Sequence, residues 1–147
     1  PNGKGAIASM KQALSKACVK PEQVRYINLH GTGTEFNDSM ESKAVAEVCG
    51  TKVLSSSTKP LTGHLLGAAG ATEIAFCLIT LLQKDSEKRL PVHIWDQQVD
   101  PSLTAISLVK YGQKISIDRD EVVLSNSFAF GGSNCTVVFG YGTQVVG

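Results

Sequence analysis

Apolar residues recur every three or four positions in two segments of the first half of the chain, which is the spacing of one helix face. The first set predicts an amphipathic helix over residues 4–18 and consists of Ile7, Met10, Leu14 and Ala17. The second set predicts a helix that Asn37 or Asp38 caps and that ends at Gly50. Its members are Met40, Ala44, Val45 and Val48.

Short apolar runs outside these helices predict strands. Four runs have clear strand character, at residues 24–29, 53–57, 122–126 and 136–139. Two weaker runs lie at 91–94 and 105–109, and residues 85–89 read as a polar connection. A glycine-rich turn joins the last two clear runs, which predicts an antiparallel hairpin at the end of the chain.

The segment from residue 65 to residue 83 is almost entirely apolar and predicts a third helix. Its length is close to what a bilayer requires. Glu73 lies near its middle, where a carboxylate would cost about 2.5–3.5 kcal/mol in a membrane. Gly67 and Gly70 favour close packing against neighbours. We therefore interpret the segment as a helix buried in a protein core, with no membrane span.

Helices and strands alternate through most of the chain, which predicts an α/β fold with a mixed sheet covered by helices. In such sheets, ligands bind beyond the carboxyl ends of the strands. Three glycine-rich turns follow predicted strands: His30 to Thr34, Lys59 to His64, and Ser127 to Asn134. We expect these turns to meet at one edge of the sheet.

Composition narrows the class of protein. The chain has 147 residues, enough for one domain with a core, and a net charge of +1 with no run of Lys or Arg, so nothing favours nucleic-acid binding. It begins Pro-Asn-Gly without an initiator Met or signal peptide, and we expect it to be a piece of a longer polypeptide. The four cysteines show no metal or disulfide pattern, which fits reduced thiols in the cytoplasm.

Two imidazoles and one lysine on glycine-rich turns favour acyl or carbonyl chemistry. His30 and His64 can each exchange a proton near neutral pH, and a neutral imidazole N–H can stabilise an enolate or an oxyanion. A purely structural interpretation is also open for each residue: His30 and His64 as hydrogen-bonded turn histidines, and Lys59 as a solvated loop lysine. His93, beside Trp95, reads as structural. Glu73 should be paired or hydrogen-bonded in its apolar helix.

Ser56 and Lys59 match the Ser-x-x-Lys pattern of penicillin-recognising enzymes, which requires the serine at the start of a helix. Pro60 and a glycine turn separate Lys59 from the apolar helix, and no Lys-Thr-Gly follows. The serine-lysine hypothesis is therefore rejected.

The chain resembles the carboxy-terminal half of the β-ketoacyl synthases, from about residue 3 to residue 139. The motifs that carry the resemblance are His30-Gly-Thr-Gly-Thr34, Asn37-Asp38, Ser57-Thr58-Lys59, Thr62-Gly-His-Leu-Leu-Gly-Ala-Ala-Gly70, Glu73 and Asn126-Ser-Phe-Ala-Phe-Gly-Gly-Ser-Asn134. The resemblance implies a thiolase-like fold of two α/β halves, each with a five-stranded mixed sheet. It also implies condensation of a cysteine-bound acyl group with malonyl-carrier protein, in fatty acid or polyketide synthesis.

By this resemblance, His30 and His64 bind the malonyl thioester carbonyl and stabilise the enolate. Lys59 supports the His64 region. Phe130 contributes a backbone N–H to the oxyanion hole and a gating side chain. The substrate-binding positions are Thr32, Thr34, Phe128, Gly131 and Gly132, with the two threonines on the phosphopantetheine arm.

The resemblance implies no required cofactor, although some family members hold a structural monovalent cation. The matching positions are Asn28, Glu73, Ser125 and Asn126. Expected partners are the acyl carrier protein, the amino-terminal half of the same enzyme and a second subunit in a homodimer. Two departures stand out: Ala129 replaces the usual glycine, and the nucleophilic cysteine, which belongs to the amino-terminal half, is missing.

Two other hypotheses remain open at this point. A thiolase relative would act on coenzyme A thioesters, but paired histidines in threonine-rich turns favour the decarboxylating enzymes. A non-catalytic partner subunit, such as a chain-length factor, would keep the fold without the chemistry. Retention of His30, His64 and Lys59 favours catalysis.

Overall fold

A computed structural model describes residues 2–142, and at Phe130 the backbone alone. Its centre is a five-stranded sheet with the strand order β4-β2-β1-β6-β7. The strands are β1 (Val24–Asn28), β2 (Leu54–Ser56), β4 (Ser107–Leu108), β6 (Val122–Phe128) and β7 (Asn134–Gly140). The first four in this order are parallel, and β7 runs antiparallel to β6. The predicted mixed sheet and closing hairpin are confirmed.

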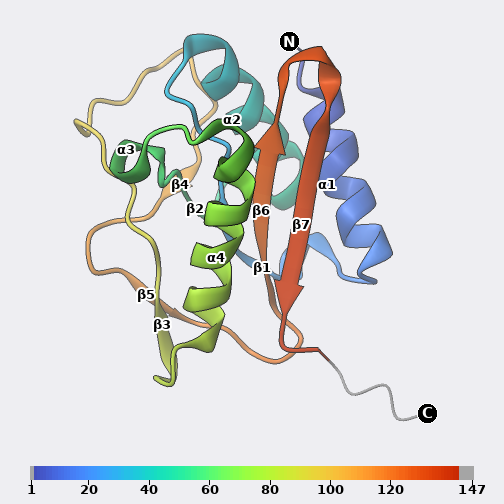
Figure 1. The fold of residues 1–147 in the computed structure, drawn as a ribbon, viewed down its shortest axis with the longest axis vertical. Coiled ribbons are helices and arrows are strands. Elements are labelled where there is room, and N and C mark those ends of the chain that lie inside the picture. The colour runs from blue at the N-terminus through green and yellow to red at the C-terminus, as the bar shows by residue number, and fades with distance from the viewer. Residues whose placement is uncertain (1, 143–147) are drawn as a thin grey trace.

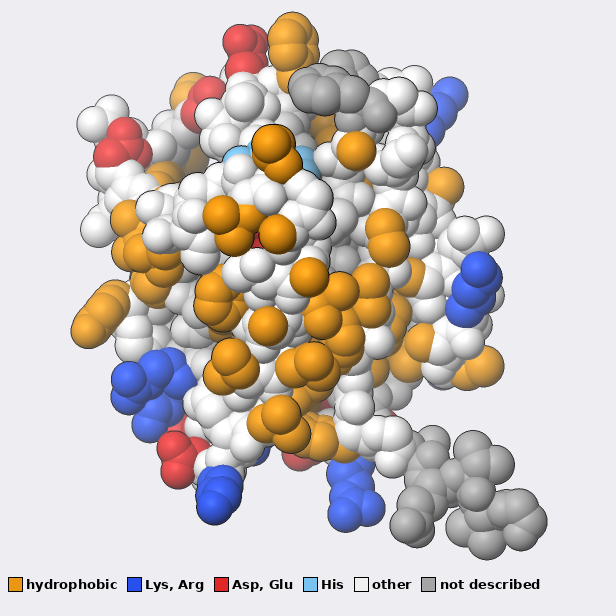
Figure 2. All heavy atoms as spheres, viewed as in Figure 1, with side chains coloured by type: hydrophobic (Ala, Val, Ile, Leu, Met, Phe, Trp, Pro, Cys, Tyr) orange, Lys and Arg blue, Asp and Glu red, His pale blue; other side chains and the backbone are white. Residues whose placement is uncertain are grey.

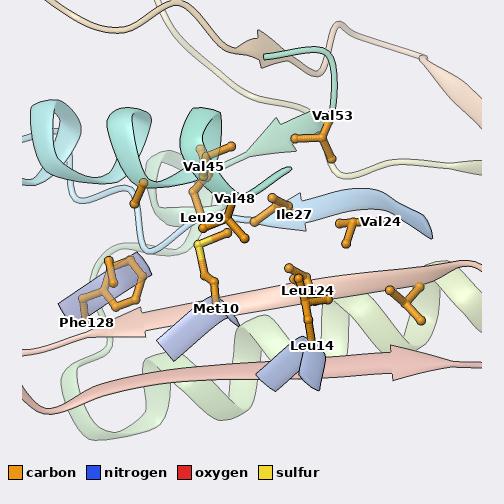
Figure 3. Packing of buried hydrophobic residues seen from close by; sticks show 13 residues of the cluster. Met10, Leu14, Val24, Ile27, Leu29, Val45, Val48, Val53, Leu124 and Phe128 are labelled. Carbon is orange, nitrogen blue, oxygen red and sulfur yellow. The ribbon is translucent and has the colours of Figure 1, made fainter. Parts of the chain in front are cut away.

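Helices cover both faces of the sheet (Figure 1). Helices α1 (Lys4–Lys16) and α2 (Glu35–Cys49) lie on one face, and α4 (Ala69–Leu82) lies on the other. Because side chains alternate along a strand, neighbouring residues serve different cores. Ile27 and Leu124 pack with α1 and α2, as Figure 3 shows, whereas Tyr26 and Val123 pack with α4.

Short elements complete the chain. They are η1 (Pro21–Gln23), the four-residue α3 (Lys59–Thr62), η2 (Leu66–Ala68) and η3 (Phe130–Gly132). A separate two-stranded antiparallel ribbon joins β3 (Glu87–Arg89) to β5 (Lys114–Ser116). The predicted polar connection at 85–89 therefore contains a strand. Its partner lies 27 residues away, beyond the range of local pattern.

The structure corrects three element boundaries. Helix α2 begins at Glu35 after Thr34, so neither Asn37 nor Asp38 is its cap, while Gly50 follows its end as predicted. The apolar helix begins only at Ala69, because Leu66 adopts a left-handed φ of 50° that interrupts the helix. The predicted strand at 105–109 is reduced to β4.

The predicted strand at 91–94 does not form. Instead, its backbone groups bond to its surroundings one at a time. The Pro91 carbonyl accepts from the Ser56 hydroxyl at 2.7 Å, and the His93 N–H donates to the Val109 carbonyl at 3.2 Å. The segment from Leu90 to Ile106 thus crosses the end of the sheet without a regular strand.

Helix α4 is buried on one side only. Glu73, Cys77 and Leu81 face the sheet, whereas Leu78, Ile79 and Leu82 are 42%, 61% and 76% exposed. In Figure 2, apolar side chains gather on the face of the molecule that α4 covers. Complete burial of this helix, as expected from the sequence, is therefore wrong for this chain. Over residues 2–142, every helix is too short or too polar to cross a membrane.

Candidate active site

The predicted catalytic residues lie at the carboxyl ends of the parallel strands. His30 follows β1, Lys59 follows β2 and opens α3, and Phe128 ends β6. The rings of His30 and His64 lie edge to face, with centroids 5.5 Å apart and planes at 83°. The His30 ring also lies 6.0 Å from that of Phe128. The two histidines, 34 residues apart in sequence, therefore form one site. The side chain of Phe130 lies outside the described residues.

The turn after α3 fixes the orientation of His64. The backbone N–H of Leu66 donates to His64 Nδ1 at 3.2 Å. A ring nitrogen that accepts a hydrogen bond carries no proton, so in this arrangement Nε2 carries the proton and is the donor. The left-handed backbone at Leu66 aims its N–H at the ring. This hydrogen bond therefore favours the tautomer of His64 whose Nε2–H can donate to a ligand.

His30 is half-buried, and its surroundings disfavour the protonated form of the ring. Burial, the ammonium of Lys59 and the neighbouring His64 lower its pKa from 6.5 to about 4. Its Nδ1 is buried and finds no hydrogen-bond partner within residues 2–142. At neutral pH His30 is therefore uncharged, and it keeps an unused polar atom beside the His64 ring.

Lys59 is a buried lysine that ties two of the turns together. Only 7% of the residue is exposed, and Nζ donates both to the His30 carbonyl and to Glu73 Oε1. Burial raises the pKa of Glu73, and the hydrogen bond and charge of Lys59 oppose that rise. The prediction that Glu73 is paired or hydrogen-bonded is confirmed, and its partner among the described residues is Lys59. The ammonium contacts the His30 turn directly, whereas its expected role concerned the His64 region.

Gly31 allows the His30 turn to lie against β2. Its φ is +42°, and a Cβ at this position would lie 2.5 Å from the Ser57 Cβ. The Ser57 hydroxyl donates to the Gly31 carbonyl at 2.7 Å. Gly33, two residues later, has a φ of +69° but open space where its Cβ would lie. The close approach is therefore specific to Gly31.

We predict that Gly31→Ala displaces the His30 turn from β2, because the methyl group overlaps backbone-anchored Ser57. Unfolding by urea should show a loss of stability from the overlap of roughly 1–3 kcal/mol, in addition to about 1 kcal/mol for the left-handed backbone at Gly31. Gly33→Ala is the matched control, since it adds left-handed strain without overlap and should cost about 1 kcal/mol. Equal losses in the two variants would contradict the close-approach interpretation.

Glu41 is a site residue that the sequence analysis missed. Only 2% of it is exposed, and its two carboxylate oxygens accept the backbone N–H groups of His30 at 2.9 Å and Gly31 at 2.8 Å. Asn37 and Asn126 donate to it as well. Two signals were available in the sequence: its position on the apolar face of α2, one residue after Met40, and a spacing of four residues from Asn37.

The predicted cation ligands divide between the two faces of the sheet. Asn28 and Ser125 are register partners on β1 and β6, and both share the α4 side with Glu73. One buried oxygen on each, Asn28 Oδ1, Ser125 Oγ and Glu73 Oε2, finds no partner among the described residues. The Asn126 side chain instead bonds to Glu41 and accepts from Thr136 Oγ1 at 2.9 Å on the opposite face. Three of the four positions therefore fit a site for a hard cation.

A cavity of about 910 Å³ opens beside the histidines. Its lining includes Thr32, Gly33, Lys59, His64 and Trp95. The hydroxyls of Thr32 and Thr34 lie 3.0 Å apart. His93 also lines the cavity, and its Nδ1 accepts from the Ser57 N–H at 3.0 Å, as suits a structural histidine. The space is large enough for an extended ligand arm.

The glycine-rich turn after β6 is open. A Cβ at Gly131 or Gly132 would meet nothing within 4 Å, and both have positive φ values. Phe128 is buried beneath the turn and contacts the His30 ring. The backbone could therefore approach a ligand closely at Gly131 and Gly132.

None of the four cysteines is placed as a nucleophile within the described residues. Cys77 faces the sheet from α4 and donates to the Leu124 carbonyl, and burial raises the pKa of Cys77 and of Cys49 to about 12. Cys18 and Cys135 are exposed, but Cys18 follows α1 and Cys135 lies in β7. A reactive cysteine normally needs a lowered pKa. No cysteine of the described residues is thus placed as a nucleophile beside the two histidines.

Comparison with known proteins decides the family. Residues 1–91 match the sequence model described as "Beta-ketoacyl synthase, C-terminal domain". The chain belongs to the β-ketoacyl synthase family. It is the carboxy-terminal part of such an enzyme, and its thiolase-like α/β fold agrees with the solved ketosynthase structures.

Three relatives illustrate the similarity. The 3-oxoacyl-[acyl-carrier-protein] synthase 2 of Synechocystis sp. is 37% identical over 142 residues, covering 95% of this chain and 32% of the relative. The mitochondrial 3-oxoacyl-[acyl-carrier-protein] synthase of Arabidopsis thaliana is 34% identical over a match that covers 94% of this chain and 30% of the relative. A solved structure from Xenorhabdus doucetiae holds the ketosynthase ApeO in complex with its chain length factor ApeC. It matches this chain at 43% identity with a TM-score of 0.83, and the match covers 95% of this chain and 34% of that one. The chain thus spans about a third of the length of these relatives.

Proposed function

We propose that this chain supplies the decarboxylating side of a 3-oxoacyl-acyl-carrier-protein synthase. The observation that carries the proposal is the pair of imidazoles, with ring centroids 5.5 Å apart at the carboxyl ends of the strands. Their position in a synthase fold supports a decarboxylative Claisen condensation of an acyl thioester with malonyl-carrier protein, in fatty acid or polyketide synthesis.

In this proposal, His30 and His64 act on the malonyl thioester. An N–H of each ring donates to the thioester carbonyl oxygen. As the bond to the malonyl carboxylate breaks, carbon dioxide leaves and the electron pair forms an enolate whose oxygen the two donors stabilise. The enolate carbon then attacks the acyl thioester carbonyl held by a cysteine outside this chain, and the thiolate leaves. The fixed proton on His64 Nε2 supports its role as a donor.

Lys59 and the glycine-rich turn have supporting roles in the proposal. Lys59 opens the turn that carries His64 and holds the His30 carbonyl in place. After burial, its positive charge is the next cause that lowers the pKa of His30. The Phe130 backbone N–H belongs to the proposed oxyanion hole for the acyl carbonyl, and its side chain to the proposed acyl gate. Thr32, which lines the cavity, and Thr34, whose hydroxyl lies beside that of Thr32, would contact the phosphopantetheine arm that carries the substrate. Phe128, Gly131 and Gly132 would lie close to the reacting end.

A structural monovalent cation fits three of the four expected positions. Asn28, Ser125 and Glu73 would hold it through the three buried oxygens that lack partners. When bound, such an ion would supply only positive charge beneath the site. It would offset the cost of burying the Glu73 carboxylate next to apolar side chains.

The complete enzyme would include an amino-terminal part with the nucleophilic cysteine, and we propose that it works with acyl carrier protein as a homodimer in the cytoplasm. A non-catalytic role, as in a chain-length factor, is the alternative function. The ketosynthase ApeO, which this chain resembles, forms a complex with a chain length factor, ApeC. The retained histidine pair supports catalysis.

A chimera tests the proposal. Residues 2–142 would replace the matching third of the Synechocystis relative, which supplies the missing parts. The chimera should convert acyl-carrier protein and malonyl-carrier protein into a 3-oxoacyl product that mass spectrometry can identify. A folded chimera that forms the acyl-enzyme but makes no 3-oxoacyl product would contradict the synthase proposal. The unmodified relative is the positive control.

We predict that the isolated 147-residue chain has no condensing activity and self-associates. It lacks an acyl-accepting cysteine, and the exposed apolar residues of α4 are an association surface. Light scattering should show oligomers, and Ile79→Glu with Leu82→Glu should shift them toward monomer. Tyr111→Glu, which changes a 92% exposed residue outside α4, is the control. Turnover by the pure chain would contradict the predicted lack of activity. A monomeric state of the unsubstituted chain would contradict the predicted self-association.

A further inference from the structure

One wall of the cavity is a segment without regular structure, from His93 to Ala105. Among the described residues, the hydrogen bonds from Ile94 to Ala105 join residues of the segment only to each other. Its apolar side chains are poorly covered, since Ile94 is 46% and Val99 is 74% exposed. At its far end the segment runs into β4, which pairs with β2. The position of this cavity wall therefore depends on what holds its near end.

His93 holds the near end of the cavity wall with both its backbone and its ring. Its N–H donates to the Val109 carbonyl at 3.2 Å, and its Nδ1 accepts the N–H of Ser57 at 3.0 Å. Because Nδ1 is the acceptor, the proton of the neutral ring lies on Nε2. A protonated imidazole carries a proton on both nitrogens. The ring of His93 can therefore accept from Ser57 only while it is neutral.

Ser57, the donor to His93, is also joined to the two catalytic turns. Its hydroxyl donates to the Gly31 carbonyl at 2.7 Å and accepts the N–H of Lys59 at 3.3 Å. A Cβ at Gly31 would lie 2.5 Å from that of Ser57, so the two backbones lie in close contact. Ser57 therefore links the cavity wall to the turns that begin at His30 and Lys59.

We propose that His93 is a positioning residue whose neutral ring fixes the cavity wall to Ser57, and that protonation of the ring releases the wall. The consequence for substrate binding rests on the proposed function, but the fixing of the wall does not. With the wall in place, the cavity keeps its shape around the proposed phosphopantetheine arm. In acid, the wall would separate from the turn and the arm would lose one side of its site.

The surroundings of His93 set the direction of this pH dependence. Burial lowers the pKa of His93 from its ordinary value of 6.5, and the charge of Asp38 opposes that change. The released ring titrates near 6.5, so the contact to Ser57 is complete above this pH. It is lost as the pH falls through the lower pKa of the fixed ring. The charged and titratable groups that line the same cavity are Glu35, Asp38, Glu41, Lys59, His64 and Asp100.

Two substitutions separate the acceptor from the titration. His93→Asn places an amide oxygen near the position of Nδ1, so it keeps an acceptor for the Ser57 N–H but has no proton to gain. His93→Leu is close to the ring in size and has no acceptor. The cavity wall should therefore stay fixed in the asparagine variant at every pH and be released in the leucine variant at every pH.

Trp95 gives a direct signal from the cavity wall. It is the only tryptophan in the chain, and its ring centroid lies 6.2 Å from that of His93. In the 147-residue chain, its emission maximum should move to longer wavelength as the pH falls below 6.5, over the range in which far-ultraviolet circular dichroism stays constant. His93→Asn should show the neutral maximum throughout, and His93→Leu the longer wavelength throughout.

Amide hydrogen exchange at Ser57 measures the contact itself. At pH 7 the Ser57 amide should exchange roughly 5-fold faster in His93→Leu than in the unsubstituted chain, as for the loss of one hydrogen bond. His93→Asn should exchange at the unsubstituted rate. Should His93→Leu fail to fold, the unsubstituted chain and His93→Asn still decide the question, because protonation removes the acceptor without any substitution.

Two results would overturn the proposal. One is a pH-dependent emission maximum that persists in His93→Asn, and the other is a folded His93→Leu with the emission and Ser57 exchange of the unsubstituted chain. In the chimera, His93→Leu should raise KM for malonyl-carrier protein roughly 5-fold with little change in kcat, and His93→Asn should change neither. An inactive parent chimera would count against the proposed function alone, since the fluorescence and exchange measurements need no activity.

Discussion

His64→Ala in the chimera should abolish carbon dioxide release from malonyl-carrier protein while acyl loading of the cysteine stays measurable. The variant removes one of the two donors to the developing enolate, and loss of one such donor costs about 10²–10³-fold in rate. Loading precedes this step and uses a cysteine from outside the chain. Radiolabelled acyl transfer and carbon dioxide release measure the two steps separately.

The matched control for His64→Ala is Leu61→Ala, which changes a 62% exposed residue of the neighbouring α3 turn. Both activities of that control should equal those of the parent. Normal carbon dioxide release from His64→Ala would refute the enolate-stabilising role. Equal loss of loading and release would instead indicate a general collapse of the site.

Lys59→Met should destabilise the chain by roughly 3–5 kcal/mol, because it leaves the buried Glu73 carboxylate without its cation. Urea unfolding measures the change. The double variant Lys59→Met with Glu73→Met should recover most of the stability, since it replaces the ion pair with apolar side chains of similar size. The two variants differ only in whether an uncompensated charge stays buried.

Lys11→Met provides the comparison for an exposed ion pair. The Lys11 and Glu47 side chains are 59% and 55% exposed, so their pairing should contribute at most about 1 kcal/mol. A loss of that small size for Lys59→Met would show that Glu73 is stable in its apolar surroundings without the lysine. Bound cation at Asn28 and Ser125 could then be sought as the compensating charge.

The sequence predicted the frame of the site because its signals are local. Glycine-rich turns after strand-like runs predicted that His30, His64 and Lys59 meet at one edge, and the structure confirms that they do. Strand alternation also contained a signal that the sequence analysis left unused. Ser125 and Asn126 are consecutive in β6, so their side chains cannot both face Glu73.

Other features depend on contacts between distant segments and could not be predicted from local pattern. Glu73 pairs with Lys59, 14 residues earlier, only because α3 and α4 fold against the same end of the sheet. Strand β3 forms because β5 lies beside it. The left-handed Leu66, which delays α4 and orients His64, has no marker in its residue type, since leucine rarely adopts that conformation.

The most direct test of the central claim is carbon dioxide release from malonyl-carrier protein by the chimera before any acyl group is supplied. This half-reaction depends on the donors that this chain contributes and needs no acyl-enzyme. We expect the parent chimera to release carbon dioxide and form acetyl-carrier protein, at a rate that falls about 10²–10³-fold in His64→Ala. A folded chimera that loads acyl groups but releases no carbon dioxide would contradict the claim and favour a non-catalytic partner subunit.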